Sequence, residues 1–97
     1  MATSHKATRF YISGFVQGVG YRFFARAAAG KLGIRGYVKN LFDGRVEVYA
    51  IGSEEQLRAF LGELWRGPRD ATIDEVAEDT AEILENFAND FSIEHEH

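Results

Sequence analysis

A glycine-rich segment close to the start of the chain has the residue types of an anion-binding loop. Residues 14–20 read Gly-Phe-Val-Gln-Gly-Val-Gly and contain no acidic side chain. Because glycine adopts positive φ at little cost, consecutive backbone N–H groups can converge on one anion. The candidate phosphate-binding residues in this loop are Gly14, Phe15, Val16, Gln17, Gly18, Val19 and Gly20. The pattern is consistent with a phosphate cradle made of main-chain amides.

Arg22 follows this loop at a position where a cation is unusual. It lies in the first turn of a predicted helix, where a positive charge opposes the helix dipole at a cost of about 0.3–1 kcal/mol. No Ser, Thr, Asp or Asn stands at the predicted N-cap, so the first helical N–H groups lack a side-chain partner. A bound phosphate would engage both those groups and the planar guanidinium. The structural alternative is that the glycines only shape a turn and that Arg22 pairs with Glu47 or Glu94.

Other common site chemistries are absent from the sequence. No Gly-Lys-Ser or Gly-Lys-Thr follows the loop, and the spacing G-x-G-x-x-G is missing, so nucleotide binding is not indicated. The chain has no cysteine, which excludes disulfides, thiolate metal sites and thiol nucleophiles. His95 and His97 share a face if they lie on a strand, but an exposed terminal pair is more often solvated than metal-bound. We therefore expect no metal and no cofactor.

The composition fits one compact domain. The chain has 97 residues, 45% of them hydrophobic, and no apolar run approaches the roughly 18 residues of a membrane span. We expect a single domain over residues 8–97, preceded by a flexible N-terminal extension over residues 1–7. Because the first residues lack the apolar stretch of a signal peptide, we expect a cytoplasmic protein that binds no membrane. We also expect a monomer that acts on a small molecule and binds no nucleic acid.

The net charge of −4 is distributed unevenly along the chain. Residues 1–42 contain no Asp or Glu, and their basic residues are Lys6, Arg9, Arg22, Arg26, Lys31, Arg35 and Lys39. Residues 43–97 hold all 15 acidic residues and only four arginines. A site built from the first half would therefore attract anions. The alternative is that the two halves interleave in space and their charges pair.

Hydrophobic periodicity predicts the elements that must position the loop and Arg22. Strands are expected at residues 9–14, 34–40 and 45–51, and helices at residues 21–32 and 54–66. A capping box at residues 53–56 begins the second helix, and Gly33 suits the C-cap of the first. Residues 72–76 resemble a strand, but residues 76–88 also fit a helical stripe, so this region stays ambiguous. Phe91-Ser92-Ile93 alternates like a short closing strand.

The order β-α-β-β-α-β predicts an α+β fold of the ferredoxin-like, split β-α-β type. Such a sandwich has one antiparallel sheet with both helices on one face. The loop at residues 14–20 then joins the first strand to the first helix, where the helix dipole also favours an anion. The fold hosts many unrelated functions, so the function must be argued from the site.

Two segments of the chain resemble the signatures of the acylphosphatase family. They run from Ile12 to Arg22 (Ile-Ser-Gly-Phe-Val-Gln-Gly-Val-Gly-Tyr-Arg) and from Gly36 to Asn40 (Gly-Tyr-Val-Lys-Asn), followed by Gly44, Val46 and Gly52. The resemblance implies a ferredoxin-like sandwich that hydrolyses carboxyl-phosphate bonds to a carboxylate and inorganic phosphate without metal. It also implies that Arg22 binds phosphate and is catalytic, that Asn40 orients the attacking water, and that residues 14–20 cradle the phosphate.

The resemblance has one structural alternative, at Asn40, and one departure from the family pattern, at the C-terminus. In its own context, Asn40 is more simply a turn residue that ends a strand before a hairpin. The C-terminus departs from the family pattern, because it is acidic and places Glu94 where a basic residue is expected. This departure leaves the docking of the last strand open.

The implied chemistry is physically reasonable for these residues. An acyl phosphate releases a carboxylate whose conjugate acid has a pKa of about 4.3, so the leaving group needs little help from a general acid. Phosphoryl transfer can then rest on positioning and on charge stabilisation by an arginine and backbone amides. The side-chain carbonyl of Asn40 can accept a proton from water and hold its oxygen in line.

Two other functions stay open. A catalytically silent phosphate-binding or regulatory domain would retain the loop and Arg22 without turnover. A ferredoxin-like RNA-binding module would stack bases on strand tyrosines, here Tyr11, Tyr37 and Tyr49. Against that module, the chain is net acidic and contains no Lys/Arg-Gly-Phe/Tyr signature.

Overall fold

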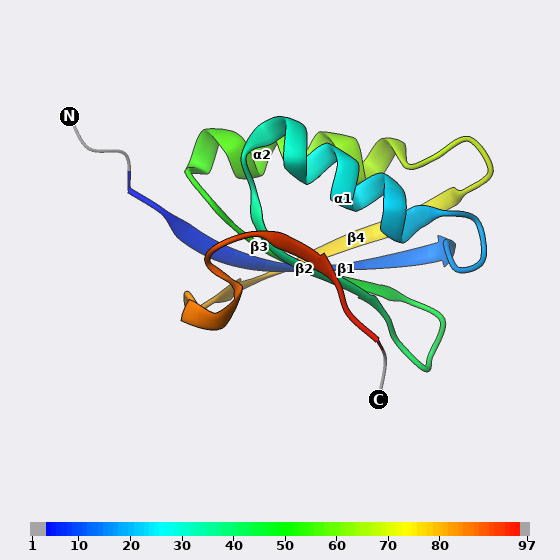
Figure 1. Ribbon diagram of the computed structural model, residues 1–97. Helices are drawn as coiled ribbons and strands as arrows, with labels where there is room; N and C mark the ends of the chain where they lie inside the picture. The colour runs from blue at the N-terminus through cyan, green and yellow to red at the C-terminus, as the bar shows by residue number, and fades with distance from the viewer. Residues whose placement is uncertain (1–3, 96–97) are drawn as a thin grey trace.

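Two helices cover one face of a five-stranded sheet, as Figure 1 shows. The structure is a computed structural model that describes residues 4–95. Its elements are β1 (Lys6–Phe15), α1 (Tyr21–Leu32), β2 (Arg35–Asn40), β3 (Val46–Gly52), α2 (Glu54–Arg66), β4 (Thr72–Ala81), the 3₁₀ helix η1 (Glu85–Phe87) and β5 (Phe91–Ile93). The predicted bounds of both helices are confirmed. β1 begins earlier than predicted, inside the expected N-terminal extension, of which residues 1–3 lie outside the described range.

The strands are arranged in the order β4-β1-β3-β2-β5. β1 pairs antiparallel with β3 and β4, β2 pairs antiparallel with β3, and β5 pairs parallel with β2. The predicted ferredoxin-like fold is confirmed, but the sheet is mixed and not wholly antiparallel. The reason is that the chain crosses the open face of the sheet between β4 and β5 (Figure 1), so β5 joins the opposite edge in the direction of β2.

The ambiguous region is a strand in its first part, because residues 72–81 form the extended edge strand β4, whereas residues 85–87 form the short 3₁₀ helix η1. Its pairing with β1 shifts register just before Gly14, which leaves Asp74 as an extra residue at a β-bulge. Ile73 and Val76 therefore both pack on the core beneath the helices, although they are three residues apart. The bulge gives this pair a spacing typical of a helix. The apolar stripe over residues 76–88 has another cause, because Val76 packs beneath the helices whereas Ala81 and Leu84 pack on the opposite face of the sheet.

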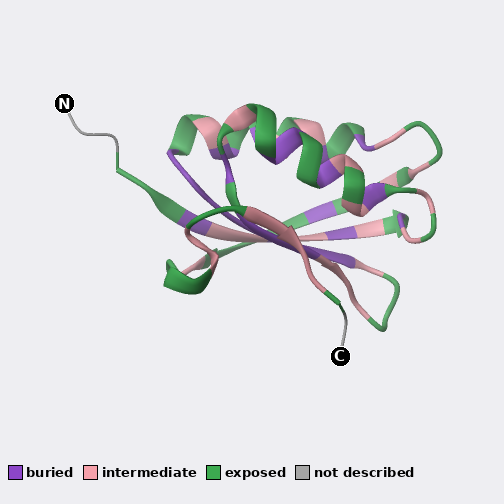
Figure 2. Ribbon diagram, viewed as in Figure 1, coloured by how far each residue is buried: buried purple, intermediate pink, exposed green. Residues whose placement is uncertain are grey.

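The core lies between the sheet and the two helices, where Figure 2 shows the buried positions. Among its fully buried side chains are Phe10, Ile12, Val38, Val46, Val48, Ala25, Ala29, Phe60 and Leu64. The hydroxyl of Tyr21 donates to Leu64 O at 2.6 Å and joins the first turn of α1 to the end of α2. This contact positions the start of α1, and therefore the loop before it. No helix in residues 4–95 has the length and apolar character that a membrane span requires.

The opposite face of the sheet is partly covered by residues 82–90. The rings of Tyr37 and Tyr49 stack with centroids 5.3 Å apart, and the ring of Phe87 in η1 lies 4.8 Å from that of Tyr37. Leu84 N donates to the Tyr49 hydroxyl at 2.7 Å, and that hydroxyl donates to a backbone carbonyl of the same segment. Both tyrosines are buried, so bases cannot stack on them. The RNA-binding alternative therefore loses two of its three tyrosines.

The last strand docks despite the acidic C-terminus. Glu94 N donates to Val38 O at 2.9 Å, which extends the pairing of β5 with β2. The carboxylate of Glu94 accepts a hydrogen bond of 2.6 Å from Ser92 Oγ. Because the Glu94 side chain is satisfied within its own segment, the strand needs no basic residue at this position.

Candidate active site

Arg22 and Asn40 line the same cavity, which lies where the loop after β1, the first turn of α1 and the end of β2 meet. Its volume is about 250 Å³. The residues that line it are Val16, Gly18, Gly20, Tyr21, Arg22, Phe23 and Asn40. The tertiary fold thus brings together a glycine loop, a guanidinium and a side-chain amide that are separate in the sequence.

The start of α1 presents free backbone donors to this cavity. Gly18 and Gly20 have φ values of 76° and 81°, a region that favours glycine. Gly20 is the N-cap of α1, makes no side-chain capping hydrogen bond, and is followed by a first turn without acidic residues. The first helical hydrogen bond runs from Phe24 N to Gly20 O at 3.0 Å, so the N–H groups of residues 21–23 have no partner within the helix. These donors and the helix dipole favour an anion here.

Arg22 is partly buried in that first turn. It takes part in none of the ion pairs formed within residues 4–95. Glu47 accepts a hydrogen bond from the Tyr37 hydroxyl and lies with Oε2 3.9 Å from Arg9 Nε, and Glu94 bonds within its own segment. The alternative that Arg22 pairs with either carboxylate is therefore wrong.

Asn40 faces the helices because of its place in β2. It is the last residue of that strand and pairs with Val46 of β3. Since side chains alternate along a strand, Asn40 shares a face with Val38, which is buried in the core beneath the helices. This alternation brings the Asn40 amide to the cavity beside α1 and not to the open face of the sheet.

Four residues of the predicted cradle do not line the cavity, namely Gly14, Phe15, Gln17 and Val19. Gly14 lies at the β-bulge, where a Cβ would come within 2.2 Å of Thr72 O, so the close approach of β4 requires glycine. Phe15 is exposed, and Val19 packs against the core. Their predicted phosphate contacts therefore stay predictions.

The side chain of Gln17 reaches the hairpin between β2 and β3. Its Nε2 donates to Leu41 O at 2.8 Å and to Arg45 O at 2.9 Å. Gln17 does not line the cavity, so its predicted phosphate contact stays a prediction. No pattern in the sequence indicated the hairpin contact.

Sequence reasoning missed two residues that line the cavity, Tyr21 and Phe23. Burial raises the pKa of Tyr21 well above its usual value, so its hydroxyl stays protonated and bound to the α2 backbone. Phe23 is 62% exposed, which is unusual for a phenylalanine. The guanidinium of Arg26 lies 5.6 Å from the centre of its ring. The available signal was that Phe23 lies outside the apolar stripe of its helix, directly after Arg22.

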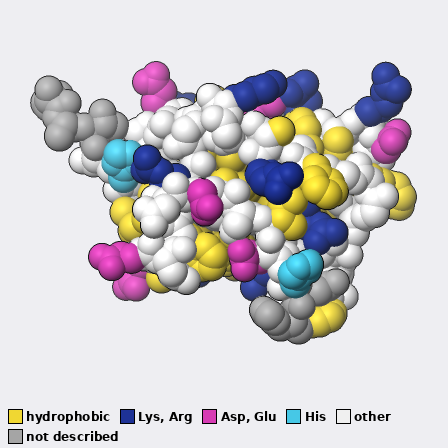
Figure 3. All heavy atoms as spheres, in the orientation of Figure 1, with side chains coloured by type: hydrophobic (Ala, Val, Ile, Leu, Met, Phe, Trp, Pro, Cys, Tyr) yellow, Lys and Arg dark blue, Asp and Glu magenta, His cyan; other side chains and the backbone are white. Residues whose placement is uncertain are grey.

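The charge asymmetry of the sequence is largely dispersed in space. Basic and acidic side chains are mixed over the face that Figure 3 shows. The cause is the topology, because β1 from the basic half pairs with β3 and β4 from the acidic half. The cavity itself keeps a positive character, since Arg22 is the one charged residue that lines it.

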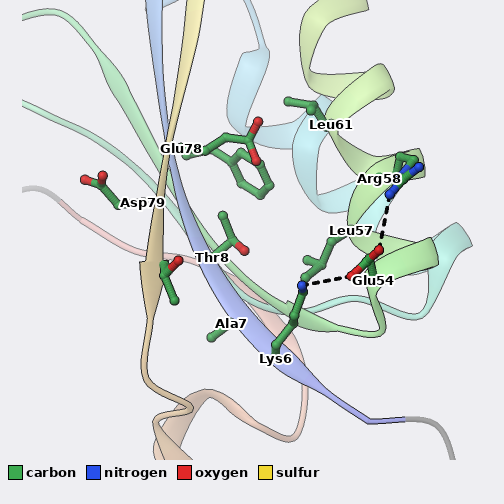
Figure 4. A pocket seen from close by; sticks show the side chains of 11 residues that line it. Lys6, Ala7, Thr8, Glu54, Leu57, Arg58, Leu61, Glu78 and Asp79 are labelled. Atoms are coloured by element: carbon green, nitrogen blue, oxygen red, sulfur yellow. Dashed lines mark hydrogen bonds and ion pairs between the residues drawn. The ribbon is translucent and has the colours of Figure 1, made fainter.

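A second cavity, of about 440 Å³, lies at the other end of β1 between α2 and β4 (Figure 4). Its two basic side chains share one partner: Lys6 Nζ lies 3.1 Å from Glu54 Oε1, and Arg58 Nη2 lies 3.2 Å from Glu54 Oε2. The hydrogen bond from Lys6 holds the pKa of the Glu54 carboxyl below its usual range. Glu78 and Asp79 add negative charge. This cavity therefore lacks an unpaired cation for an anionic ligand.

Metal ligands are not gathered in the part of the chain that the structure describes. Within residues 4–95, no three His, Cys, Asp or Glu side chains are grouped closely enough to hold a metal ion. His97, the second member of the histidine pair considered from the sequence, lies outside the described residues. The candidate active site also contains neither a carboxylate nor an imidazole.

Comparison with known proteins points to one family. The profile described as Acylphosphatase matches residues 8–93. An acylphosphatase of Solibacter usitatus is 51% identical over 78 residues, which cover 80% of this chain and 81% of that protein. An acylphosphatase of Archaeoglobus fulgidus is 53% identical over 81 residues, which cover 84% of this chain and 90% of that protein.

Solved structures agree with this result. The crystal structure of acylphosphatase from Bacillus subtilis matches with a TM-score of 0.85 and 34% identity, over 93% of this chain and 98% of that chain. Full-length HypF in the phosphate- and nucleotide-bound form matches with a TM-score of 0.89 and 30% identity, over 99% of this chain and 13% of that chain. Sequence signatures, fold, family profile and relatives all agree, and the chain therefore belongs to the acylphosphatase family of enzymes.

Proposed function

We propose that the chain hydrolyses small acyl phosphates to a carboxylate and inorganic phosphate by in-line attack of water, with Arg22 and Asn40 as catalytic residues. One observation carries this proposal. An arginine without an ion-pair partner in residues 4–95, the uncapped start of a helix and an asparagine amide all border one cavity of about 250 Å³.

The phosphate group is held by Arg22 and by the backbone N–H groups that begin α1. The guanidinium donates through its planar fork, and the amides donate along the helix axis. These donors also stabilise the charge on the equatorial oxygens in the transition state. The phosphate in turn neutralises the cation that opposes the dipole of α1.

Asn40 orients the water. Its side-chain carbonyl accepts a hydrogen bond from water and holds the oxygen in line with phosphorus. As the new P–O bond forms, the bond from phosphorus to the acyl oxygen breaks and its electron pair leaves with the carboxylate. The proton of the attacking water passes to a phosphate oxygen or to solvent. No general acid is required, because the leaving carboxylate is weakly basic.

The acyl group meets Phe23. This ring lines the cavity and is largely exposed, so an apolar acyl group that covers it removes apolar surface from water. Phe23 follows Arg22 directly, so the two side chains start from neighbouring positions of one helical turn. We therefore propose that aromatic acyl phosphates such as benzoyl phosphate bind better than acetyl phosphate.

Arg22 and the amides supply the positive charge that a metal ion would otherwise supply. We propose activity without a metal ion, and this is supported by the lack of any carboxylate or imidazole among the residues that line the cavity. The cytoplasmic location, the monomeric state and the single domain over residues 8–97 stay predictions from the sequence.

Hydrolysis of benzoyl phosphate by the purified chain tests the proposal. We expect turnover that persists in EDTA, competitive inhibition by inorganic phosphate, and loss of turnover in Arg22→Ala. If the chain binds phosphate without turnover, the silent phosphate-binding alternative is correct. A strict metal requirement would overturn the proposed mechanism.

A further inference from the structure

We infer that Gln17 is a positioning residue, whose side chain sets the distance between the phosphate loop and Asn40. This inference rests on the proposed function, because it concerns the same cavity. It assigns a role to the contact between the Gln17 side chain and the β2–β3 hairpin, which phosphate binding by the loop does not require.

Two hydrogen bonds carry the inference. Gln17 Nε2 donates to Leu41 O at 2.8 Å and to Arg45 O at 2.9 Å. Leu41 directly follows Asn40, and its N–H donates to Arg45 O at 2.8 Å, which closes the base of the β2–β3 hairpin. A single amide group therefore binds the residue that follows β2 and the residue that precedes β3, directly beside Asn40.

The hairpin has no other side-chain hydrogen bond to the loop within residues 4–95. The remaining side-chain bonds of the hairpin are internal, from Arg45 N and Arg45 Nε to the carboxylate of Asp43. Its tip, residues 42–44, is exposed. The position of Asn40 relative to the loop therefore depends on the pairing of β2 within the sheet and on the two hydrogen bonds of Gln17.

The chemistry of the contact is specific to glutamine. The two N–H groups of one side-chain amide match two carbonyl acceptors. A carboxylate at this position would face both carbonyls without donating, and an apolar side chain would leave them without this partner. Asparagine is one methylene shorter, so its amide falls short of the hairpin.

The two hydrogen bonds from Gln17 to the hairpin act as a tether, and their loss would affect the chemical step more than phosphate binding. Arg22 and the amides at the start of α1 do not depend on the hairpin, so phosphate still binds. The water on Asn40 would be displaced relative to phosphorus, and a misplacement of about 1 Å can cost roughly 100-fold in rate.

The test compares Gln17→Leu and Gln17→Glu with the control Asp43→Asn, which weakens a contact inside the same hairpin. For both Gln17 variants we expect kcat for benzoyl phosphate to fall about 10- to 100-fold, with the inhibition constant of inorganic phosphate changed less than about threefold. Asp43→Asn should keep kcat within about twofold of wild type. Melting temperatures show whether each variant is folded.

A second measurement does not depend on turnover. In ¹⁵N-labelled wild type, the side-chain NH₂ of Gln17 should exchange slowly with solvent, and Gln17→Leu should shift the side-chain resonances of Asn40. The inference is overturned if the Gln17 variants keep kcat, if phosphate binding falls in parallel with kcat, or if Asp43→Asn loses as much. An inactive wild type would overturn the proposed function instead, while the exchange measurement would still test the tether.

Discussion

Arg22→Ala should raise stability and abolish activity at the same time. Arg22 is in the first turn of α1, where its charge opposes the helix dipole, and it forms no ion pair within residues 4–95 that would compensate. If phosphate is the ligand of Arg22, the protein without phosphate is destabilised by this charge and has no interaction that compensates.

The size of the stability gain follows from the position of the charge. Removal of a cation from the first turn is worth about 0.3–1 kcal/mol, and alanine is also the better helix former. For a domain of this size, about 1 kcal/mol shifts the melting temperature by roughly 4–8 °C, so we expect a rise of about 1–8 °C without phosphate.

The loss of activity should be much larger than the gain in stability. A single donor to a developing oxyanion is worth about 10²–10³ in rate, and an arginine in phosphoryl transfer can be worth more. We expect kcat/KM for benzoyl phosphate to fall at least about 100-fold in Arg22→Ala.

Lys31→Ala is the matched control, because Lys31 lies in the last turn of the same helix. Its charge interacts favourably with the dipole, so its removal should lower stability by about 0.3–1 kcal/mol and leave activity unchanged. Thermal unfolding by circular dichroism and a phosphate-release assay measure both effects. A lower melting temperature in Arg22→Ala, or activity close to wild type, would refute the reasoning.

Three further outcomes are expected from the same structure. Asn40→Ala should lower kcat at least about tenfold, while the inhibition constant of inorganic phosphate changes less than about threefold in steady-state kinetics. Loss of phosphate binding with kcat intact would contradict this prediction. Phe23→Ala should raise KM for benzoyl phosphate about fivefold more than KM for acetyl phosphate, as expected for about 1 kcal/mol of apolar contact, and equal changes would exclude an acyl contact. Burial, helped by the hydrogen bond to Glu47, raises the pKa of Tyr37 from 10.0 to about 12, so the folded state holds its proton more tightly than the unfolded state. The free energy of unfolding should therefore fall as pH rises from about 10 towards 12, and urea titrations of Tyr37→Phe should show a shallower fall.

Both helices were predictable because their signals are local. Gln56 N donates to Ser53 Oγ at 3.1 Å, and Ser53 N donates to Gln56 Oε1 at 2.8 Å, which forms the predicted capping box. Gly33 ends α1 with a φ of 72°. Each signal acts within one helical turn, so no knowledge of the rest of the chain was needed.

The edge strand β4 could not be predicted in the same way. Beyond residue 76 its apolar residues pack on both faces, since Val76 lies beneath the helices and Ala81 lies on the opposite face. At Asp74 its period is also broken by a bulge, where β4 passes so close to Gly14 that a Cβ there would lie 2.2 Å from Thr72 O. A bulge is a property of two strands together, and periodicity within one segment cannot reveal it.

Part of the candidate site likewise follows from local sequence, and part depends on the tertiary structure. The anion-binding character of the loop and the unusual Arg22 follow from the sequence, because glycine φ preferences, missing caps and helix dipoles act over a few residues. Asn40 looked like a turn residue in its own context, and only the alternation and pairing of β2 bring it to the cavity. The Gln17 contact with the hairpin and the parallel docking of β5 likewise join segments far apart in the chain, so their geometry is set only when the sheet and helices pack together.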